Sequence, residues 1–446
     1  MILQCVILFF AVLVCSTNSI SIVVAEEVSP IYFAPPENFV APPENLKPID
    51  YGRFINDLIN SKNKEKQTIF NVDDFGAKGE GSNDTQAFLE AWKIACATKK
   101  SVILVPSNKT YVLKPPIKFL GPCNFKITMR IHGTIMASSN MKEYEEDPRK
   151  WVSFEQVKDL TVDGGGTFNG NGQVWWDSSC KINNTEGCHN SGAPTAATFY
   201  KCSNLRVNNL RFLNSQQIHL TFQRCKNVDV SDLTIIAPQD SPNTDGIHVS
   251  STENMNIRNC IIGTGDDCIS IVGGSKNVRS TNIMCGPGHG ISIGSLGKNQ
   301  ARDTVSDIYV EGAMLWGTSN GVRIKTWQGG QGYAQNIKFV DIKMMNVSNP
   351  IIIDQNYCDQ SKPCQSQKDA VQVRNIVYKN IRGTSNSEVA MKLDCSRIDS
   401  CENIRVENIH LFSHVDGSPT SSCVNANIAV VGEVSPGMYC QQRQSQ

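Results

Sequence analysis

The sequence predicts an all-β chain that folds as a right-handed parallel β-helix with an N-terminal capping helix. The first observation is a set of short segments with alternating apolar and polar residues, at 246–250, 268–272, 290–294 and 321–325. A period of two over four or five residues indicates a half-buried strand. The second is that Asn, Gly and Asp, which turns require, lie between such segments. The third is that no helical pattern long enough for strand–helix–strand units separates them.

Comparable strand starts recur from residue 127 onward, and they define a repeat. They lie at Ile127, Leu160, Leu205, Val228, Met255, Val278, Ile308, Ile337, Val371 and Ile404. Successive spacings in the central part are 23, 27, 23, 30 and 29 residues. Such a repeat indicates a solenoid in which each coil stacks on the last. A β-sandwich or propeller is the alternative, but neither predicts a variable period with polar groups in phase.

The amino-terminal 67 residues differ in composition from the rest of the chain. Residues 1–25 contain no charged side chain, and their apolar run at 2–15 is short for a membrane span. We therefore expect a secretory signal peptide cleaved after Ala25, with an uncleaved anchor as the alternative. Residues 26–67 are rich in proline, which predicts an extended linker or removable pro-region, with a short helix near 51–60.

The catalytic β-helix domain is expected to cover residues 68–446. Asn83, Asp84 and Thr85 are suited to begin the amphipathic helix predicted at 86–97. A helix at this place would cap the open amino end of the solenoid and block pairing of its edge strand.

Cysteine usage fits the secretory route. Of 17 cysteines, 15 remain after the signal has been removed with Cys5 and Cys15, which favours disulfides with at least one thiol left over. The closely spaced candidate pairs are Cys180 with Cys188, Cys268 with Cys285, Cys358 with Cys364, Cys395 with Cys401, and Cys423 with Cys440. The cysteines form no zinc-like CxxC pair, so we expect no metal site.

Charge and glycosylation signals restrict the partners. Lysine plus arginine (42) balance aspartate plus glutamate (42), so no global field indicates nucleic acid. Sequons begin at Asn83, Asn108, Asn183 and Asn346, as expected of a secreted glycoprotein. After signal cleavage, we expect a monomer without a membrane anchor.

Three aspartates precede the predicted central strands. Asp245, Asp267 and His289 are each 22 residues apart, so a coil of that length stacks them about 4.8 Å apart per rung. Any one aspartate, Asp266 included, is also an ordinary turn residue. Like charges held together raise one another's pKa, so one carboxyl keeps its proton as acid while another stays ionised as base. Carboxylates roughly 6.5–9.5 Å apart would give glycosidic hydrolysis with inversion.

Adjacent residues of an ideal strand face opposite sides, so Asp266 and Asp267 cannot both reach one groove from such a strand. By parity Asp266 joins the polar side, while Asp245 and Asp267 share phase with buried isoleucines. We therefore expect the acidic residues to lie in the bend before each strand, where alternation is relaxed.

Two cations and an imidazole accompany the carboxylates. Arg323 and Lys325 lie on one face of their strand, because they are two residues apart. A guanidinium can hold a sugar carboxylate with two hydrogen bonds, so a uronic-acid polymer fits better than a neutral glucan. Solvated surface cations are the alternative.

His289, otherwise a turn residue, is expected to support the acid, and His248 is expected to line the groove. Tyr357 either stacks on a sugar or packs in the core.

The motifs together resemble the plant polygalacturonases of glycoside hydrolase family 28, which hydrolyse pectin. The resemblance covers about residues 68–440 and rests on 243–246, 265–268, 288–290, 323–325 and the Asp-Phe-Gly-Ala run at 74–77. It implies a right-handed parallel β-helix, no metal or other cofactor, and inverting hydrolysis of α-1,4-galacturonan in the cell wall. The Pro-rich segment resembles the pro-region of some members.

The resemblance also implies roles for single residues. Asp266 resembles the general acid, Asp245 and Asp267 resemble the pair that activates water, and His289 resembles the residue that supports the acid. The remaining positions resemble substrate contacts: Asn243, Arg323, Lys325 and Tyr357. A calcium-dependent pectate lyase and a non-catalytic wall-binding protein are the alternatives. The choice between endo and exo attack stays open, because loops at the ends of the groove decide it.

Overall fold

The computed structural model describes residues 67–182, 192–359, 364–365, 367–413 and 418–441. The expected signal peptide, nearly all of the Pro-rich segment and the short helix near 51–60 therefore lie outside the described residues. In the described ranges, no helix is long and apolar enough to cross a membrane.

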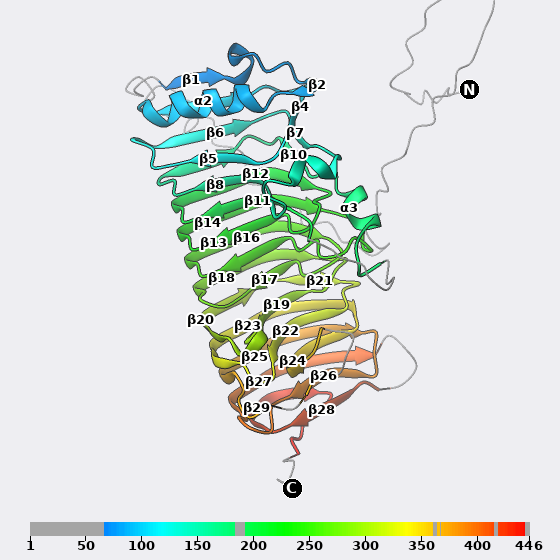
Figure 1. Ribbon diagram of the computed structural model, residues 1–446. Helices are drawn as coiled ribbons and strands as arrows, with labels where there is room; N and C mark the ends of the chain where they lie inside the picture. The colour runs from blue at the N-terminus through cyan, green and yellow to red at the C-terminus, as the bar shows by residue number, and fades with distance from the viewer. Residues whose placement is uncertain (1–66, 183–191, 360–363, 366, 414–417, 442–446) are drawn as a thin grey trace, which may run out of the picture. The chain divides into compact units, whose positions relative to one another are not determined.

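The chain winds into a parallel β-helix, and every pairing among its described strands is parallel (Figure 1). An eleven-stranded sheet takes one short strand from each coil: β5 (Ile117–Leu120), β8 (Lys150–Glu155), β11 (Thr195–Tyr200), β13 (Leu220–Gln223), β15 (Ile247–Ser250), β17 (Ile269–Ile271), β19 (Ile291–Leu296), β22 (Asn320–Trp327), β24 (Asn349–Tyr357), β26 (Val389–Asp394) and β28 (Thr420–Val424).

The second sheet is eighteen-stranded within the described residues, and it includes long strands that turn a corner. Its early strands are β1 (Thr68–Asn71), β2 (Glu80–Asn83), β3 (Ser101–Val105), β4 (Thr110–Leu113), β6 (Ile127–Ile131), β7 (Thr134–Ala137), β9 (Leu160–Asp163) and β10 (Thr167–Asn169). The later ones are β12 (Ser203–Leu213), β14 (Lys226–Ile236), β16 (Glu253–Gly263), β18 (Lys276–Cys285), β20 (Arg302–Glu311), β21 (Met314–Trp316), β23 (Gln331–Val347), β25 (Gln372–Ser385), β27 (Cys401–Ser413) and β29 (Ala426–Ser435).

The register agrees with the predicted repeat at all positions but one. Leu205 pairs with Val228, and Ile247 with Ile269 and then Ile291. The start predicted at Val371 was wrong, because the register partner of Ile337 is Ile376. This coil carries a longer loop after β24, which contains the Cys358–Cys364 disulfide, so β25 begins only at Gln372.

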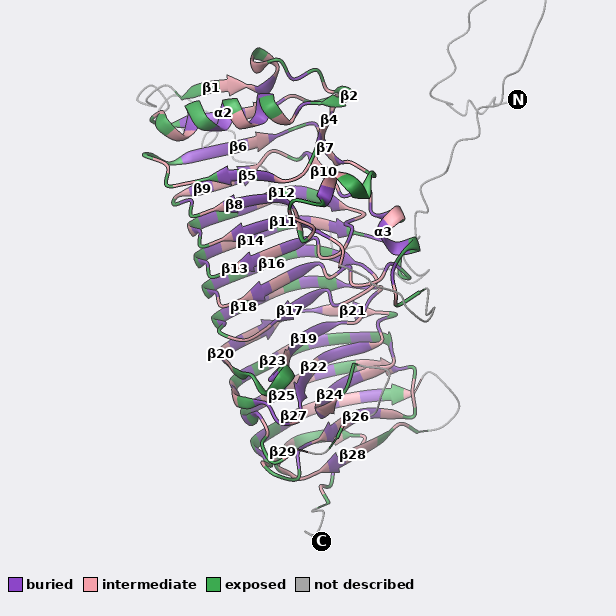
Figure 2. Ribbon diagram, in the orientation of Figure 1, coloured by how far each residue is buried: buried purple, intermediate pink, exposed green. Residues whose placement is uncertain are grey.

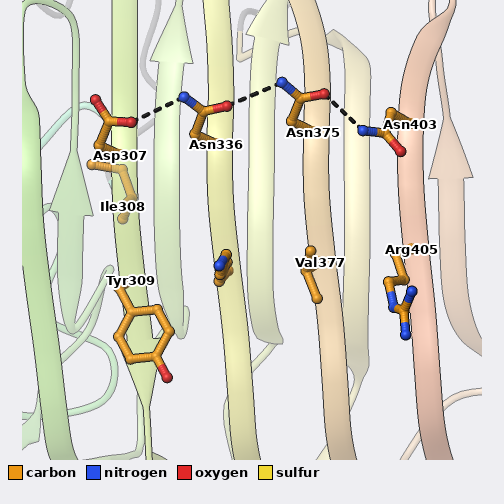
Figure 3. A pocket seen from close by; sticks show the side chains of 9 residues that line it. Asp307, Ile308, Tyr309, Asn336, Asn375, Val377, Asn403 and Arg405 are labelled. Atoms are coloured by element: carbon orange, nitrogen blue, oxygen red, sulfur yellow. Dashed lines mark hydrogen bonds between the residues drawn. The ribbon is translucent and has the colours of Figure 1, made fainter.

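Asparagine side chains stack at the corners of successive coils. Asn336, Asn375 and Asn403 each donate from the side-chain amide to the preceding coil, beginning at Asp307, over 2.9–3.0 Å (Figure 3). A matching ladder runs through Asp159, Asn204, Asn227, Asn254 and Asn277. Asparagine suits these corners because their backbone is left-handed, with φ of 57° at Asn336, and asparagine tolerates that region.

Helix α2 (Thr85–Ala97) is the amphipathic helix that the sequence predicts. It packs against the first coil through five buried residues, Ala87, Phe88, Ala91, Trp92 and Ala95, whose spacing forms one helical face (Figure 2). The Trp92 indole lies 4.9 Å from the Phe119 ring and donates to the Leu120 carbonyl at 3.0 Å. The helix therefore covers the apolar interior at the amino end of the described coils.

The remaining helical elements are short. They are α3 (Gln173–Asp177) and the 3-10 turns η2 (Val72–Phe75), η3 (Met141–Tyr144) and η4 (Lys298–Gln300).

Four of the five candidate disulfides are present: Cys268–Cys285, Cys358–Cys364, Cys395–Cys401 and Cys423–Cys440. Cys180 is disulfide-bonded, while Cys188, its expected partner, lies outside the described residues. A further bond, Cys96–Cys123, ties α2 to the first coils and escaped prediction because 27 residues separate its cysteines. Three buried thiols remain free in the described chain, at Cys202, Cys225 and Cys260.

Candidate active site

The predicted acidic residues lie in the bends that precede strands β15 and β17. Backbone hydrogen bonds stack these bends as they stack the strands, from Gly246 N–H to the Asp267 carbonyl (2.9 Å) and from His289 N–H to the Asp266 carbonyl (2.8 Å). The expectation that the acidic residues lie in the bends before the strands is therefore confirmed. Distant chain positions meet on one surface because the bends repeat in register.

Asp267 is a buried carboxylate surrounded by donors. Ser292 donates to Oδ1 at 2.8 Å, and Arg323 donates to the same oxygen at 2.7 Å. Lys325 donates to Oδ2 at 2.9 Å. The Asp267 side chain is only 3% exposed, and two cations and a hydroxyl compensate its desolvation.

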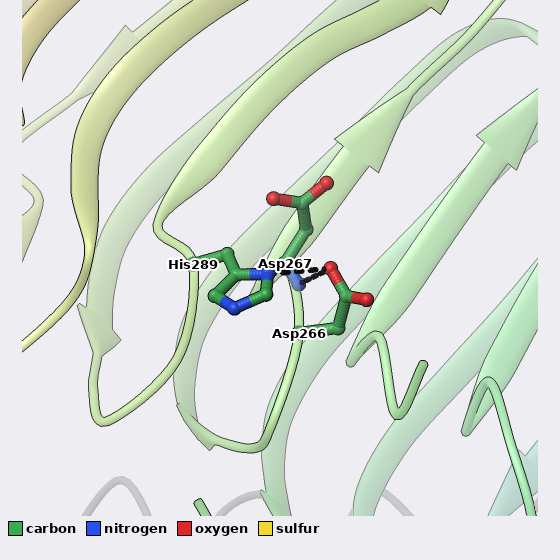
Figure 4. Close-up of side chains that lie close together, drawn as sticks. All are labelled: Asp266, Asp267 and His289. Atoms are coloured by element: carbon green, nitrogen blue, oxygen red, sulfur yellow. Dashed lines mark hydrogen bonds and ion pairs between the residues drawn. The ribbon is translucent and has the colours of Figure 1, made fainter. Parts of the chain in front are cut away.

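Asp266 forms a pair with His289. Nδ1 of His289 lies 2.9 Å from Oδ1 of Asp266, which also accepts the Asp267 backbone N–H at 2.8 Å (Figure 4). Burial raises the pKa of Asp266, but the hydrogen bond and charge of His289, with the charges of Lys325 and Lys181, outweigh burial and lower it to about 2. The hydrogen bond therefore ties the Asp266 carboxyl to the His289 imidazole.

Asp245 is in a different environment. Ser270 donates to its Oδ2 at 2.7 Å, and His248 Nδ1 lies 3.7 Å from that oxygen. Burial and the neighbouring charge of Asp266 raise the pKa of Asp245, and His248 acts in the opposite direction. The pKa values of Asp245 and Asp266 are therefore shifted in opposite directions by their surroundings.

A buried histidine holds the bend of Asp245 from inside. His219 has no exposed surface, and its Nδ1 lies 3.0 Å from the Asp245 carbonyl, which also accepts the His219 backbone N–H at 2.8 Å. Its Nε2 accepts the Ser215 N–H at 3.4 Å, so Nδ1 carries the proton. Burial lowers the pKa of His219 to about 4.

The predicted substrate contacts lie around this centre. The Lys325 ammonium is 5.4 Å from the centre of the Tyr357 ring, and burial raises the pKa of Tyr357 to about 12. Asn243, with a left-handed backbone (φ 57°), lines a pocket of about 280 Å³. The other lining residues include Arg149, Trp175 and Gln217. A cation, an indole and amides at one pocket suit an acidic sugar.

A metal site is the other arrangement that the cluster allows. Asp266, Asp267 and His289 offer ligand atoms within 4.8 Å of one another. Those atoms are already engaged, because Asp266 is hydrogen-bonded to His289 and Asp267 accepts from two cations. Adjacent ammonium and guanidinium groups oppose a divalent cation at Asp267. The donor set therefore does not fit a resident metal.

The sequence reasoning missed four residues of this site. Ser270 and Ser292 were visible only as polar positions of alternating strands, and His219 lies outside every motif. Lys181, which lowers the pKa of Asp266, comes from a loop after α3. The equal spacing of 25 residues between each serine and its aspartate was the available signal.

Comparisons with known proteins place the chain among carbohydrate-active enzymes. A family model described as glycosyl hydrolases family 28 matches residues 96–435. Polygalacturonase-2 of Solanum lycopersicum is 52% identical over 383 residues, which cover 85% of this chain and 83% of that protein. A polygalacturonase of Malus domestica is 53% identical over 366 residues, covering 82% and 78%.

A solved structure supports the architecture. The hyperthermoactive exopolygalacturonase from Thermotoga maritima matches with a TM-score of 0.70 at 20% identity, covering 85% of this chain and 95% of that chain. At this identity the structural match shows the fold.

Proposed function

The chain belongs to glycosyl hydrolases family 28, and from this membership and the site we propose that it hydrolyses the α-1,4-galacturonosyl bonds of polygalacturonate, the acidic chain of pectin. The enzyme is a glycoside hydrolase of the polygalacturonase type. The observation that carries the substrate class is the cationic pair Arg323 and Lys325 beside three aspartates. A galacturonate carboxylate near these cations gains a charge-assisted contact that a neutral sugar lacks.

In the proposed reaction, Asp266 protonates the glycosidic oxygen, while Asp245 and Asp267 direct a water molecule to the anomeric carbon from the opposite face. The proton moves from water to a carboxylate, the bond to the leaving oxygen breaks, and the product has inverted configuration. His289 supplies the proton that Asp266 needs through their 2.9 Å contact. No step requires a metal.

The pKa order of the free protein bears on these roles. Asp245 has the raised pKa and Asp266 the lowered one, which is the reverse of what an acid at Asp266 needs. A bound uronate resolves this, because its negative charge offsets Lys325 and its bulk excludes water from Asp266. Both changes raise the pKa of Asp266 and favour its protonated form. The alternative assignment exchanges the two roles and makes Asp245 the general acid.

Polymer binding extends beyond the central cluster in this proposal. The pocket beside Asn243 accepts a further galacturonate unit toward the amino-terminal coils, with Arg149 as its cation. Tyr357 lies on the other side, next to Lys325, and offers a ring to a sugar face. Secretion as a monomer to the cell wall fits the disulfides and the apolar amino terminus.

The experiment compares Asp266→Asn and Asp245→Asn on two substrates. The unmodified protein is expected to release reducing ends from polygalacturonate, and each variant to lose about 100-fold or more of that activity. A galacturonide with a dinitrophenol leaving group needs no acid, so Asp266→Asn should retain most of its turnover there and Asp245→Asn should not.

The outcomes separate the possibilities. Rescue of Asp245→Asn by the activated substrate would exchange the two roles. An unmodified protein that is folded, as judged by circular dichroism, yet releases no reducing ends would refute the proposed function.

A further inference from the structure

We infer that His248 and Ser270 are positioning residues that hold Asp245 as the proton acceptor of the reaction, while Asp267 is held by cationic donors on both of its oxygens. The inference rests on the proposed function and assigns different tasks to two aspartates that occupy equivalent places in successive coils.

The contacts around Asp245 form a directed chain. The Ser270 hydroxyl donates its only proton to Asp245 Oδ2 at 2.7 Å. Its oxygen must therefore accept from His248 Nδ1, also at 2.7 Å, which means that Nδ1 carries a proton. The imidazole thus fixes the rotation of the hydroxyl, and the hydroxyl fixes the carboxylate. In the described chain, no donor engages Oδ1 of Asp245, so this oxygen is available to water.

The next coil repeats the arrangement with a different third member. Ser292, the register partner of Ser270, donates to Asp267 at 2.8 Å and accepts from Arg323 Nε at 3.0 Å. In each case the serine follows its aspartate by 25 residues. Arg323 keeps its charge at every working pH, and Lys325 occupies the second oxygen of Asp267.

The difference between the third members gives the two aspartates different chemistry. Asp267 accepts two hydrogen bonds on Oδ1 and one on Oδ2, and two of its three donors are cations, so a water proton would approach this carboxylate beside Arg323 and Lys325. Asp245 has one free oxygen, and its serine accepts from a histidine, whereas the serine beside Asp267 accepts from an arginine. Asp245 is therefore the aspartate that accepts the proton, while Asp267 stays held by its cationic donors.

The residues that pair with His248 on the two neighbouring strands carry no charge. Its register partners are Thr221 on β13 and Ser270 on β17, both uncharged. The charged groups that reach Asp245 are the carboxylates Asp266 and Asp267, and the cations nearest to them, Arg323 and Lys325, are engaged with Asp267.

The test measures kcat and KM on polygalacturonate across pH for His248→Asn, Ser270→Ala and two matched controls. Asparagine can still donate to Ser270 but carries no charge, and alanine removes the link. Both changes destabilise the ionised Asp245, so the acid limb of the kcat/KM profile should move upward by about one pH unit. The change should appear in kcat with little change in KM, since neither residue holds the sugar carboxylate.

The two control variants change residues on the strands that neighbour the contacts between His248, Ser270 and Asp245. Ser292→Ala should lower kcat yet leave the acid limb in place, because Arg323 and Lys325 still hold Asp267. Thr221→Val removes a hydroxyl without a partner beside His248 and should leave the profile unchanged.

Each result decides the inference. Equal loss of kcat at all pH values, with no movement of the acid limb, would reduce Ser270 and His248 to structural residues and overturn it. Movement of the alkaline limb would make Asp245 the acid and also overturn it. An inactive unmodified protein would instead contradict the proposed function, so the two failures are distinguishable.

Discussion

At the scale of single residues, the site obtains three different carboxylates from one residue type. Asp267 is compensated by two cations, Asp266 is hydrogen-bonded to His289, and Asp245 is linked through Ser270 to His248. Burial and these partners, rather than the residue type, therefore decide how the pKa values of Asp245 and Asp266 are shifted.

His219 is a residue whose titration should control stability. Its pKa is about 4 in the folded protein and about 6.5 when unfolded, so the unfolded state binds the proton more readily. Its contribution is complete above pH 6.5 and is lost as the pH falls toward 4. His219→Asn keeps a donor for the Asp245 carbonyl without this titration. Between pH 7 and 4.5, the unmodified protein should lose about 2–3 kcal/mol more unfolding free energy than the variant.

Urea unfolding at the two pH values measures this difference. The variant is the reference for the unmodified protein, because the two proteins share all other titrating groups. Identical pH dependence in the two proteins would show that His219 is not buried as a neutral imidazole.

At the scale of elements, the asparagine corners maintain the register of the coils. Asn254 donates to Asn227 at 3.1 Å, accepts from Asn277 at 2.8 Å and has a left-handed backbone (φ 58°). Asn254→Ala loses both hydrogen bonds and strains the backbone, so we expect a loss of about 1–2 kcal/mol. Asn254→Gly loses the hydrogen bonds without the strain and should lose less.

Chemical denaturation and a reducing-sugar assay provide the two readings for these variants. Activity should persist at temperatures where both remain folded, because the corner contributes no residue to the site. A glycine variant less stable than the alanine variant would remove backbone strain from the explanation.

At the scale of the whole molecule, stacked coils assemble the site from residues far apart in sequence. Asp267 and Lys325 are 58 residues apart and in contact. The assembled donor set favours hydrolysis over metal-dependent elimination, because two cations already neutralise Asp267. We expect a chelator to leave the activity unchanged and the products to show no ultraviolet absorbance from an unsaturated sugar.

The measurement is a parallel assay of reducing ends and absorbance, with and without the chelator. Activity that disappears on chelation and returns with calcium, together with absorbing products, would support a lyase.

The sequence alone determined the architecture of this protein. Alternating segments, turn residues at the corners and a 22-residue spacing identified the central strands and the register of Asp245, Asp267 and His289. Local backbone preference and the period of the side chains specify these features, so they can be predicted from the amino-acid sequence. Arg323 and Lys325 were recognised in the same way.

Tertiary structure decided which partner each carboxylate has. His289 is in register with Asp267 but contacts Asp266, because side-chain direction in a bend depends on dihedral angles that alternation does not specify. The donors Ser270 and Ser292, the buried His219 and the bond Cys96–Cys123 likewise depend on contacts between distant segments. Residue spacing gives the height of a side chain along the solenoid, and only the folded bends give its direction.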